Sequence, residues 1–185
     1  ITLNPKYFDL SSFDRNTSQM VVPENIKNII SNGGFEETVL PYSDETTLLN
    51  GYQGVENWTV GYGSIYRRKI ESDVNKPKSW IELTGIKVNT SIFKGNISNT
   101  VSTLIGQRYF VFFDLSSSID SYKQGSSVTK KVKVTADSTD KTFSILSKNT
   151  AASDLSWKNM SFTFVATTTS TIIKLENVSD QFGDV

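Results

Sequence analysis

The strongest constraint on the fold is a series of short runs rich in β-branched and aromatic residues, separated by clusters of Gly, Asn, Asp and Ser. Such runs are typical of β-strands, and little helical periodicity competes with them. The clearest predicted strands are Val55–Val60, Ile65–Ile70, Trp80–Leu83, Arg108–Leu115, Val128–Thr135, Thr142–Leu146, Ser161–Val165 and Thr171–Leu175. Strands in this number and at this spacing predict an all-β chain, an antiparallel β-sandwich of the jelly-roll type.

Alternation within the runs predicts which residues form the core. Apolar and polar residues alternate in Lys131–Val134, as in a strand with one wet face and one packed face. In Arg108–Leu115 both parities are apolar, which indicates a central strand covered on both sides. The predicted core contains Phe110, Phe112, Val132, Val134, Phe162, Phe164 and Ile173.

The length of 185 residues fits one domain. Residues 1–30 are polar, lack alternation and contain Asn4-Pro5, so we expect an N-terminal linker or arm there. The sandwich is then expected to cover residues 31–185. Because the chain starts at Ile1 without a methionine, we also expect it to be a piece of a larger assembly with further domains or subunits.

Composition removes several classes of function. Histidine and cysteine are both absent, which excludes Ser-His-Asp and Cys-His catalysis and the usual zinc sites. Lys+Arg and Asp+Glu are both 19, so no basic excess favours nucleic acid. The longest apolar runs, such as Tyr109–Phe113, are far shorter than the ~20 residues of a membrane helix, so membrane insertion is not expected. No pair of carboxylates stands out for glycoside hydrolysis, and we expect no enzyme.

Four motifs, taken in order, resemble one family. They are Ile30–Glu36, which contains Asn-Gly-Gly-Phe-Glu, then Val55–Val60, Trp157–Thr171 and Phe182–Val185. Together they are similar to carbohydrate-binding modules with the galactose-binding-like jelly roll, over about residues 31–185. Such modules also occur in phage tail and baseplate proteins and in bacterial surface proteins. The resemblance implies a sandwich that binds a saccharide.

The same resemblance implies one structural Ca²⁺ that ties the first strand to the last. The positions that match its ligands are the Gly34 carbonyl, Glu36 and Asp184. Oxygen ligands of this kind suit Ca²⁺. The alternative is that Glu36 is a solvated strand residue and Asp184 an ordinary chain end.

A sugar site needs flat apolar surface with hydrogen-bonding side chains at its rim. Tyr62, Tyr66 and Trp80 are the predicted aromatic contacts, and Arg67 and Arg68 the predicted rim, suited to anionic or phosphate-bearing glycans. The two arginines have an ordinary alternative as partners of Glu71 or Asp73. A second possible rim contains Tyr122. Trp58 and Trp157 are predicted to lie in the core instead.

These observations predict a non-catalytic carbohydrate-binding module that recognises cell-surface glycans. The expected setting is host recognition or adhesion, in a phage tail or baseplate or at a bacterial cell surface. The alternative is a structural or protein-interaction sandwich of a larger surface protein that has no sugar site.

Overall fold

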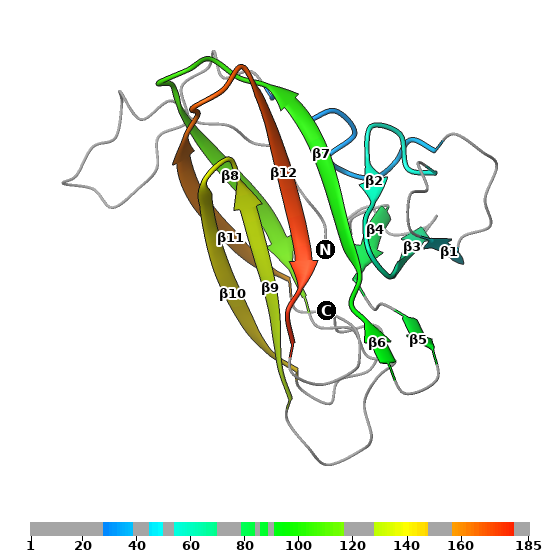
Figure 1. Ribbon diagram of the computed structural model, residues 1–185. Helices are drawn as coiled ribbons and strands as arrows, with labels where there is room; N and C mark the ends of the chain where they lie inside the picture. The colour runs from blue at the N-terminus through cyan, green and yellow to red at the C-terminus, as the bar shows by residue number, and fades with distance from the viewer. Residues whose placement is uncertain are drawn as a thin grey trace.

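The computed structural model describes residues 28–38, 45–49, 54–69, 79–83, 86–88, 91–116, 128–147 and 157–179. Over these ranges the chain forms strands and no helix, which confirms the all-β prediction (Figure 1). The strands are β1 (Glu45–Leu49), β2 (Thr59–Val60), β3 (Ser64–Lys69), β4 (Ser79–Glu82), β5 (Ile86–Val88), β6 (Ser91–Phe93), β7 (Asn96–Ser102), β8 (Arg108–Leu115), β9 (Val128–Ala136), β10 (Thr139–Ser147), β11 (Lys158–Val165) and β12 (Ser170–Asn177).

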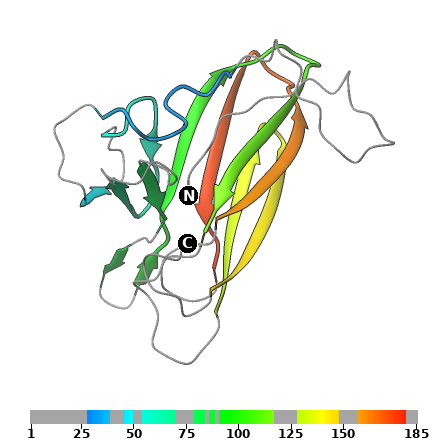
Figure 2. The same cartoon turned by 180° about the vertical axis from the view of Figure 1, so that it is seen from behind.

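The strands form two packed layers. A five-stranded antiparallel sheet has the order β10-β9-β12-β7-β2, and the antiparallel pair β8–β11 lies against one face of it (Figures 1 and 2). A three-stranded sheet, β1-β3-β4, and the β5–β6 hairpin lie beside β7 and β2. The predicted antiparallel β-sandwich is therefore confirmed.

The core lies between the layers. Alternate residues of β9 and β12 face those of β8 and β11, and Phe113 meets Phe143 edge to face with ring centroids 5.0 Å apart. Five of the seven residues predicted for the core belong to it, namely Val132, Val134, Phe162, Phe164 and Ile173. Phe110 and Phe112 are buried as well, but on the opposite face of β8 and outside this cluster. Burial of both faces of β8 is confirmed, but its central position is not, because β11 is its only partner among the described strands.

Two regions differ from the predicted strands. Val55–Val60 is an isolated bridge between Val55 and Thr38, a turn, and then the two residues of β2. The turn is possible because Asn57 adopts φ 65°, a left-handed conformation that Asn tolerates better than most residues. Strands β1, β5, β6 and β7 were not predicted. Strand β7 is polar in sequence, yet Asn99 in its middle is buried.

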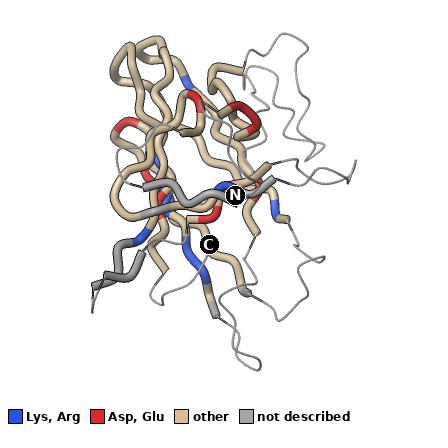
Figure 3. The backbone as a smooth tube through the Cα atoms, turned by 90° about the vertical axis from the view of Figure 1, so that its right-hand side faces the viewer, with Lys and Arg blue, Asp and Glu red and all other residues tan. Residues whose placement is uncertain are grey.

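The sandwich begins earlier in the chain than predicted. Ile30 belongs to the buried core and Ile29 packs against it, so the boundary placed before residue 31 is late. Residues 1–27 of the predicted arm lie outside the described residues. The described part contains no helix long and apolar enough to cross a membrane. Acidic and basic residues are both scattered over this part of the chain (Figure 3).

Candidate functional site

A tight turn at residues 31–35 builds one wall of the candidate site. The backbone N–H of Phe35 donates to the Asn32 carbonyl at 3.1 Å, and both residues have positive φ, 58° and 50°. This geometry turns the chain back and sends the Phe35 ring into the core, where it is fully buried. Phe35 packs against Trp58 with ring centroids 5.0 Å apart.

The Asn32 side chain ties this turn to the next loop. Its Nδ2 donates to the carbonyls of Glu37 at 2.8 Å and Glu56 at 2.9 Å, and its Oδ1 accepts from the Glu37 N–H at 3.0 Å. The Asn32 carbonyl also accepts from the Trp58 indole Nε1 at 3.0 Å. The Asn and Phe of the Asn-Gly-Gly-Phe-Glu motif therefore have structural roles: they fix the turn against the segment that leads into β2.

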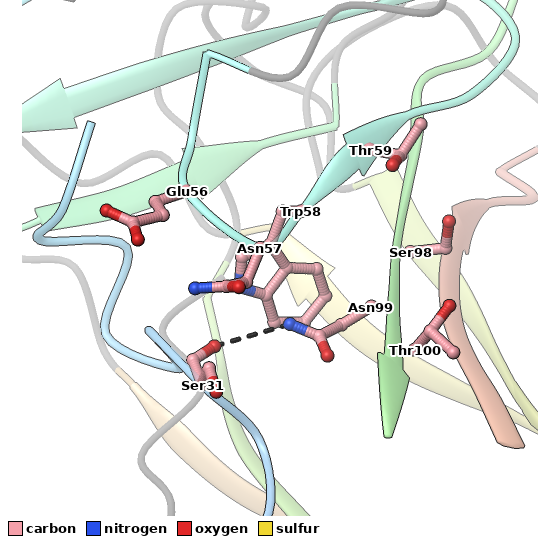
Figure 4. Close-up of a pocket in the computed structure, with 8 residues that line it drawn as sticks. All are labelled: Ser31, Glu56, Asn57, Trp58, Thr59, Ser98, Asn99 and Thr100. Atoms are coloured by element: carbon pink, nitrogen blue, oxygen red, sulfur yellow. Dashed lines mark hydrogen bonds between the residues drawn. The ribbon is translucent and has the colours of Figure 1, made fainter. Parts of the chain in front are cut away.

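Between this turn, the 56–58 loop and strand β7 lies a hollow of about 400 Å³ (Figure 4). We call it the Trp58 hollow. Its lining consists of one carboxylate, one indole, two amides and four hydroxyls, from Ser31, Glu56, Asn57, Trp58, Thr59, Ser98, Asn99 and Thr100.

The floor of the Trp58 hollow is apolar, and its walls are polar. Trp58 is only 1% exposed, and the amides of Asn57 and Asn99 lie beside its indole (Figure 4). Asn99 Nδ2 donates to the Ser31 carbonyl at 3.3 Å, which ties β7 to the first turn. Along the sheet edge, Thr59 pairs with Ser98, and Thr100 follows as an exposed residue. The hollow therefore presents many hydrogen-bonding groups over a small apolar floor.

The predicted sugar contacts fall into separate places. Tyr62 is 60% exposed in the loop that follows β2, so it is available to a ligand. Sheet register pairs Tyr66 with Glu82, and Arg68 with Trp80, which brings these positions together on the β3–β4 sheet. Trp80 is 8% exposed, and its Nε1 donates to Glu82 Oε1 at 3.2 Å.

Two tryptophans lie close together at this sheet. Trp80 meets the half-buried Trp157 edge to face at 6.4 Å. Trp80 is therefore mainly a packing residue and offers little surface for a sugar to stack on. The predicted core position of Trp58 is confirmed, and Trp157 is partly buried.

Arg67 points inward, not toward a ligand at the surface. It is 5% exposed, and its Nε donates to the Phe35 carbonyl at 2.8 Å. Its Nη2 donates to the Glu36 carbonyl at 3.2 Å and to Ser79 Oγ at 3.0 Å. The guanidinium therefore joins β3 and β4 to the first turn. The side chain of Arg68 and all of Tyr122 lie outside the described residues.

The implied calcium site is only partly described. Glu36 is exposed, and its Cγ lies close to Gly34, 3.4 Å from where a Cβ on that glycine would be. The Glu36 carbonyl already accepts from Arg67, and Asp184 lies outside the described residues. No group of three or more acidic side chains that could hold a metal occurs in the described ranges. The Ca²⁺ site stays a prediction.

Most residues that line the Trp58 hollow were missed in the sequence. Asn57, Ser98, Asn99 and Thr100 are polar residues in a chain rich in such residues, and nothing in their spacing sets them apart. One usable signal was the run Asn96–Ser102, where Ile97 and Val101 alternate with polar residues at the period of a strand. A polar residue at the inward position between them, Asn99, indicates a buried amide with a specific partner.

The comparison with protein families is consistent with a sandwich that begins at the two isoleucines Ile29 and Ile30. A family model described as "Protein of unknown function (DUF642)" matches residues 28–183. The chain belongs to this family. The DUF642 match starts at Asn28, just before the two isoleucines that enter the core, and it spans every element of the sandwich. A comparison with curated proteins found no match.

Proposed function

We propose that this DUF642 chain is a non-catalytic carbohydrate-binding module and that the saccharide binds in the Trp58 hollow. The observation that carries the proposal is the lining: six uncharged hydrogen-bonding side chains and one indole line a hollow of about 400 Å³. Sugars offer adjacent hydroxyls that both donate and accept. Amides and hydroxyls match them because they do the same.

The depth of Trp58 sets the expected mode of binding. Since the indole is almost fully buried, it forms a floor and not an exposed platform for ring stacking. Binding then depends mainly on hydrogen bonds, which replace those the sugar makes to water and give about 0.5–1.5 kcal/mol each. We expect weak binding by one module. Many copies on a virion tail or a cell surface, the predicted setting, would raise the apparent affinity through effective concentration.

A blocking substitution tests the site. Thr100→Trp places a large side chain at an exposed position of β7 that lines the hollow, where an aromatic residue suits a strand. Ser102→Trp is the matched control, because Ser102 is exposed on the same strand two residues further on and does not line the hollow. Binding of both variants and the wild type is measured on a glycan array, with thermal melts to compare their stability.

The proposal expects at least one glycan that the wild type and Ser102→Trp bind and Thr100→Trp does not. The rival reading, a structural or protein-interaction sandwich, expects no glycan to bind any of the three. A glycan bound equally by all three would place the sugar site elsewhere. Tyr62→Ala then tests the one predicted aromatic contact that is largely exposed.

A further inference from the structure

The Trp58 hollow carries no positive charge. Among its eight lining residues Glu56 is the one with an ionisable side chain, and that charge is negative. A second exposed acidic residue neighbours Glu56 along the backbone pairing, because the Glu56 N–H donates to the Glu37 carbonyl at 3.0 Å. The border of the hollow at this loop is therefore acidic.

Of the two arginines expected to receive an anionic sugar, Arg67 does not supply a compensating charge at the surface, and the side chain of Arg68 lies outside the described residues. Arg67 is 5% exposed, and its guanidinium donates to two backbone carbonyls and to a serine hydroxyl. Its positive charge is used inside the fold to join the first turn to the β3–β4 sheet. No lining residue of the hollow is a cation, so an anion there would lose water without an ion partner among these residues, which is costly.

We infer that the Trp58 hollow selects neutral glycans and discriminates against those that carry a carboxylate or a phosphate. This inference rests on the proposed function. A carboxylate held about 6 Å from Glu56 would bind about 3-fold to about 100-fold more weakly than its neutral counterpart, for effective dielectric constants of about 80 and about 20. The sequence instead predicts Arg67 and Arg68 as a rim suited to anionic or phosphate-bearing glycans.

Matched pairs of oligosaccharides test this selectivity. Short glucans, galactans and mannans are each compared with the same oligosaccharide oxidised to the carboxylate at C6, and binding to the full chain is measured for every member. The neutral member of a bound pair is expected to bind more tightly. The ratio of the neutral member's affinity to the acidic member's affinity should fall as the salt concentration rises from about 0.01 M to about 1 M, because the screening length falls from about 30 Å to about 3 Å.

Two charge-removing variants locate the source of the discrimination. Glu56→Gln should narrow the ratio of neutral to acidic binding at low salt. Asp140→Asn makes the same change in net charge on β10, the strand at the edge of the five-stranded sheet opposite β2, and should leave the ratio as in the wild type.

Each outcome has a definite meaning. Tighter binding of the acidic members, lost in Thr100→Trp, would overturn the charge selectivity and leave the proposed sugar site standing. A neutral preference that Glu56→Gln does not alter would also overturn the inference, because the carboxylate would not be its cause. No binding of any member would end both the inference and the proposed function.

Discussion

Replacement of Asn32 by alanine tests whether one side chain holds the first turn to the rest of the sandwich. The change removes three hydrogen bonds that Asn32 makes to the backbone of Glu37 and Glu56. At about 0.5–1.5 kcal/mol each, their loss costs about 1.5–4.5 kcal/mol. Alanine at φ 50° adds left-handed strain of about 1–2 kcal/mol. Since these bonds are partly exposed, we expect a loss near the lower end, about 3 kcal/mol.

A second variant separates the two contributions. Asn32→Gly loses the same three hydrogen bonds but adopts positive φ without steric strain. We expect it to be about 1 kcal/mol more stable than the alanine variant, because the relief of strain exceeds the greater freedom of glycine in the unfolded chain. Asn159→Ala is the matched control. Asn159 is exposed, and its side chain makes a single described hydrogen bond, from Nδ2 to Asp114 Oδ1 at 3.2 Å.

Urea unfolding followed by tryptophan fluorescence gives the free energies by linear extrapolation. Trp58 is a suitable reporter because its indole donates to the Asn32 carbonyl. The reasoning is refuted if Asn32→Ala unfolds at the same urea concentration as Asn159→Ala, or if the glycine variant is no more stable than the alanine variant.

Three further predictions concern other parts of the molecule. Gly61→Ala should loosen β2 from β7 and lower the melting temperature, because a Cβ there would lie 1.8 Å from Asn96 Oδ1. Hydrogen bonds from Thr167 lower the pKa of Asp137 in the folded protein. The stability that this carboxylate contributes is therefore present above its pKa in the unfolded chain and is lost as the pH falls through its pKa in the folded protein. In acid unfolding, the stability of Asp137→Asn should depend less on pH over this range than that of the wild type. If Ca²⁺ binds at the predicted ligands Gly34, Glu36 and Asp184, calcium should raise the melting temperature relative to EDTA, and identical melts would remove the site.

The sequence predicted the sandwich because its core strands carry the pattern in their own residues. Strand β8 matches its predicted bounds, since Phe110–Phe113 and Leu115 are apolar and the residues that flank the strand, Gln107 and Ser116, are polar. Strand β7 was missed because its burial results from its position inside the sheet and not from its own residues. It lies between β12 and β2, so Asn99 is buried by neighbours that local propensity does not reveal.

The site was harder to predict because it is made of contacts between distant segments. Ser31, Asn57 and Asn99 meet only when the first turn, the 56–58 loop and β7 come together, and each is an ordinary polar residue in sequence. Arg67 shows the converse. A charged residue next to an aromatic one suggested a surface site, but the acceptors for its guanidinium are backbone carbonyls some 30 residues earlier, at Phe35 and Glu36.

Strand β12 has a consequence for synthesis. It is the last strand described along the chain, yet it lies in the middle of the five-stranded sheet, between β9 and β7. Thr171 pairs with Val101, 70 residues earlier. Strands β7 and β9 therefore lack the partner that lies between them until β12 has left the ribosome. Non-local pairing of this kind folds slowly and leaves strand edges exposed in the meantime. A chain truncated before Ser170 would lose the strand that joins both halves of the sheet, and we expect it to aggregate instead of forming a smaller sandwich.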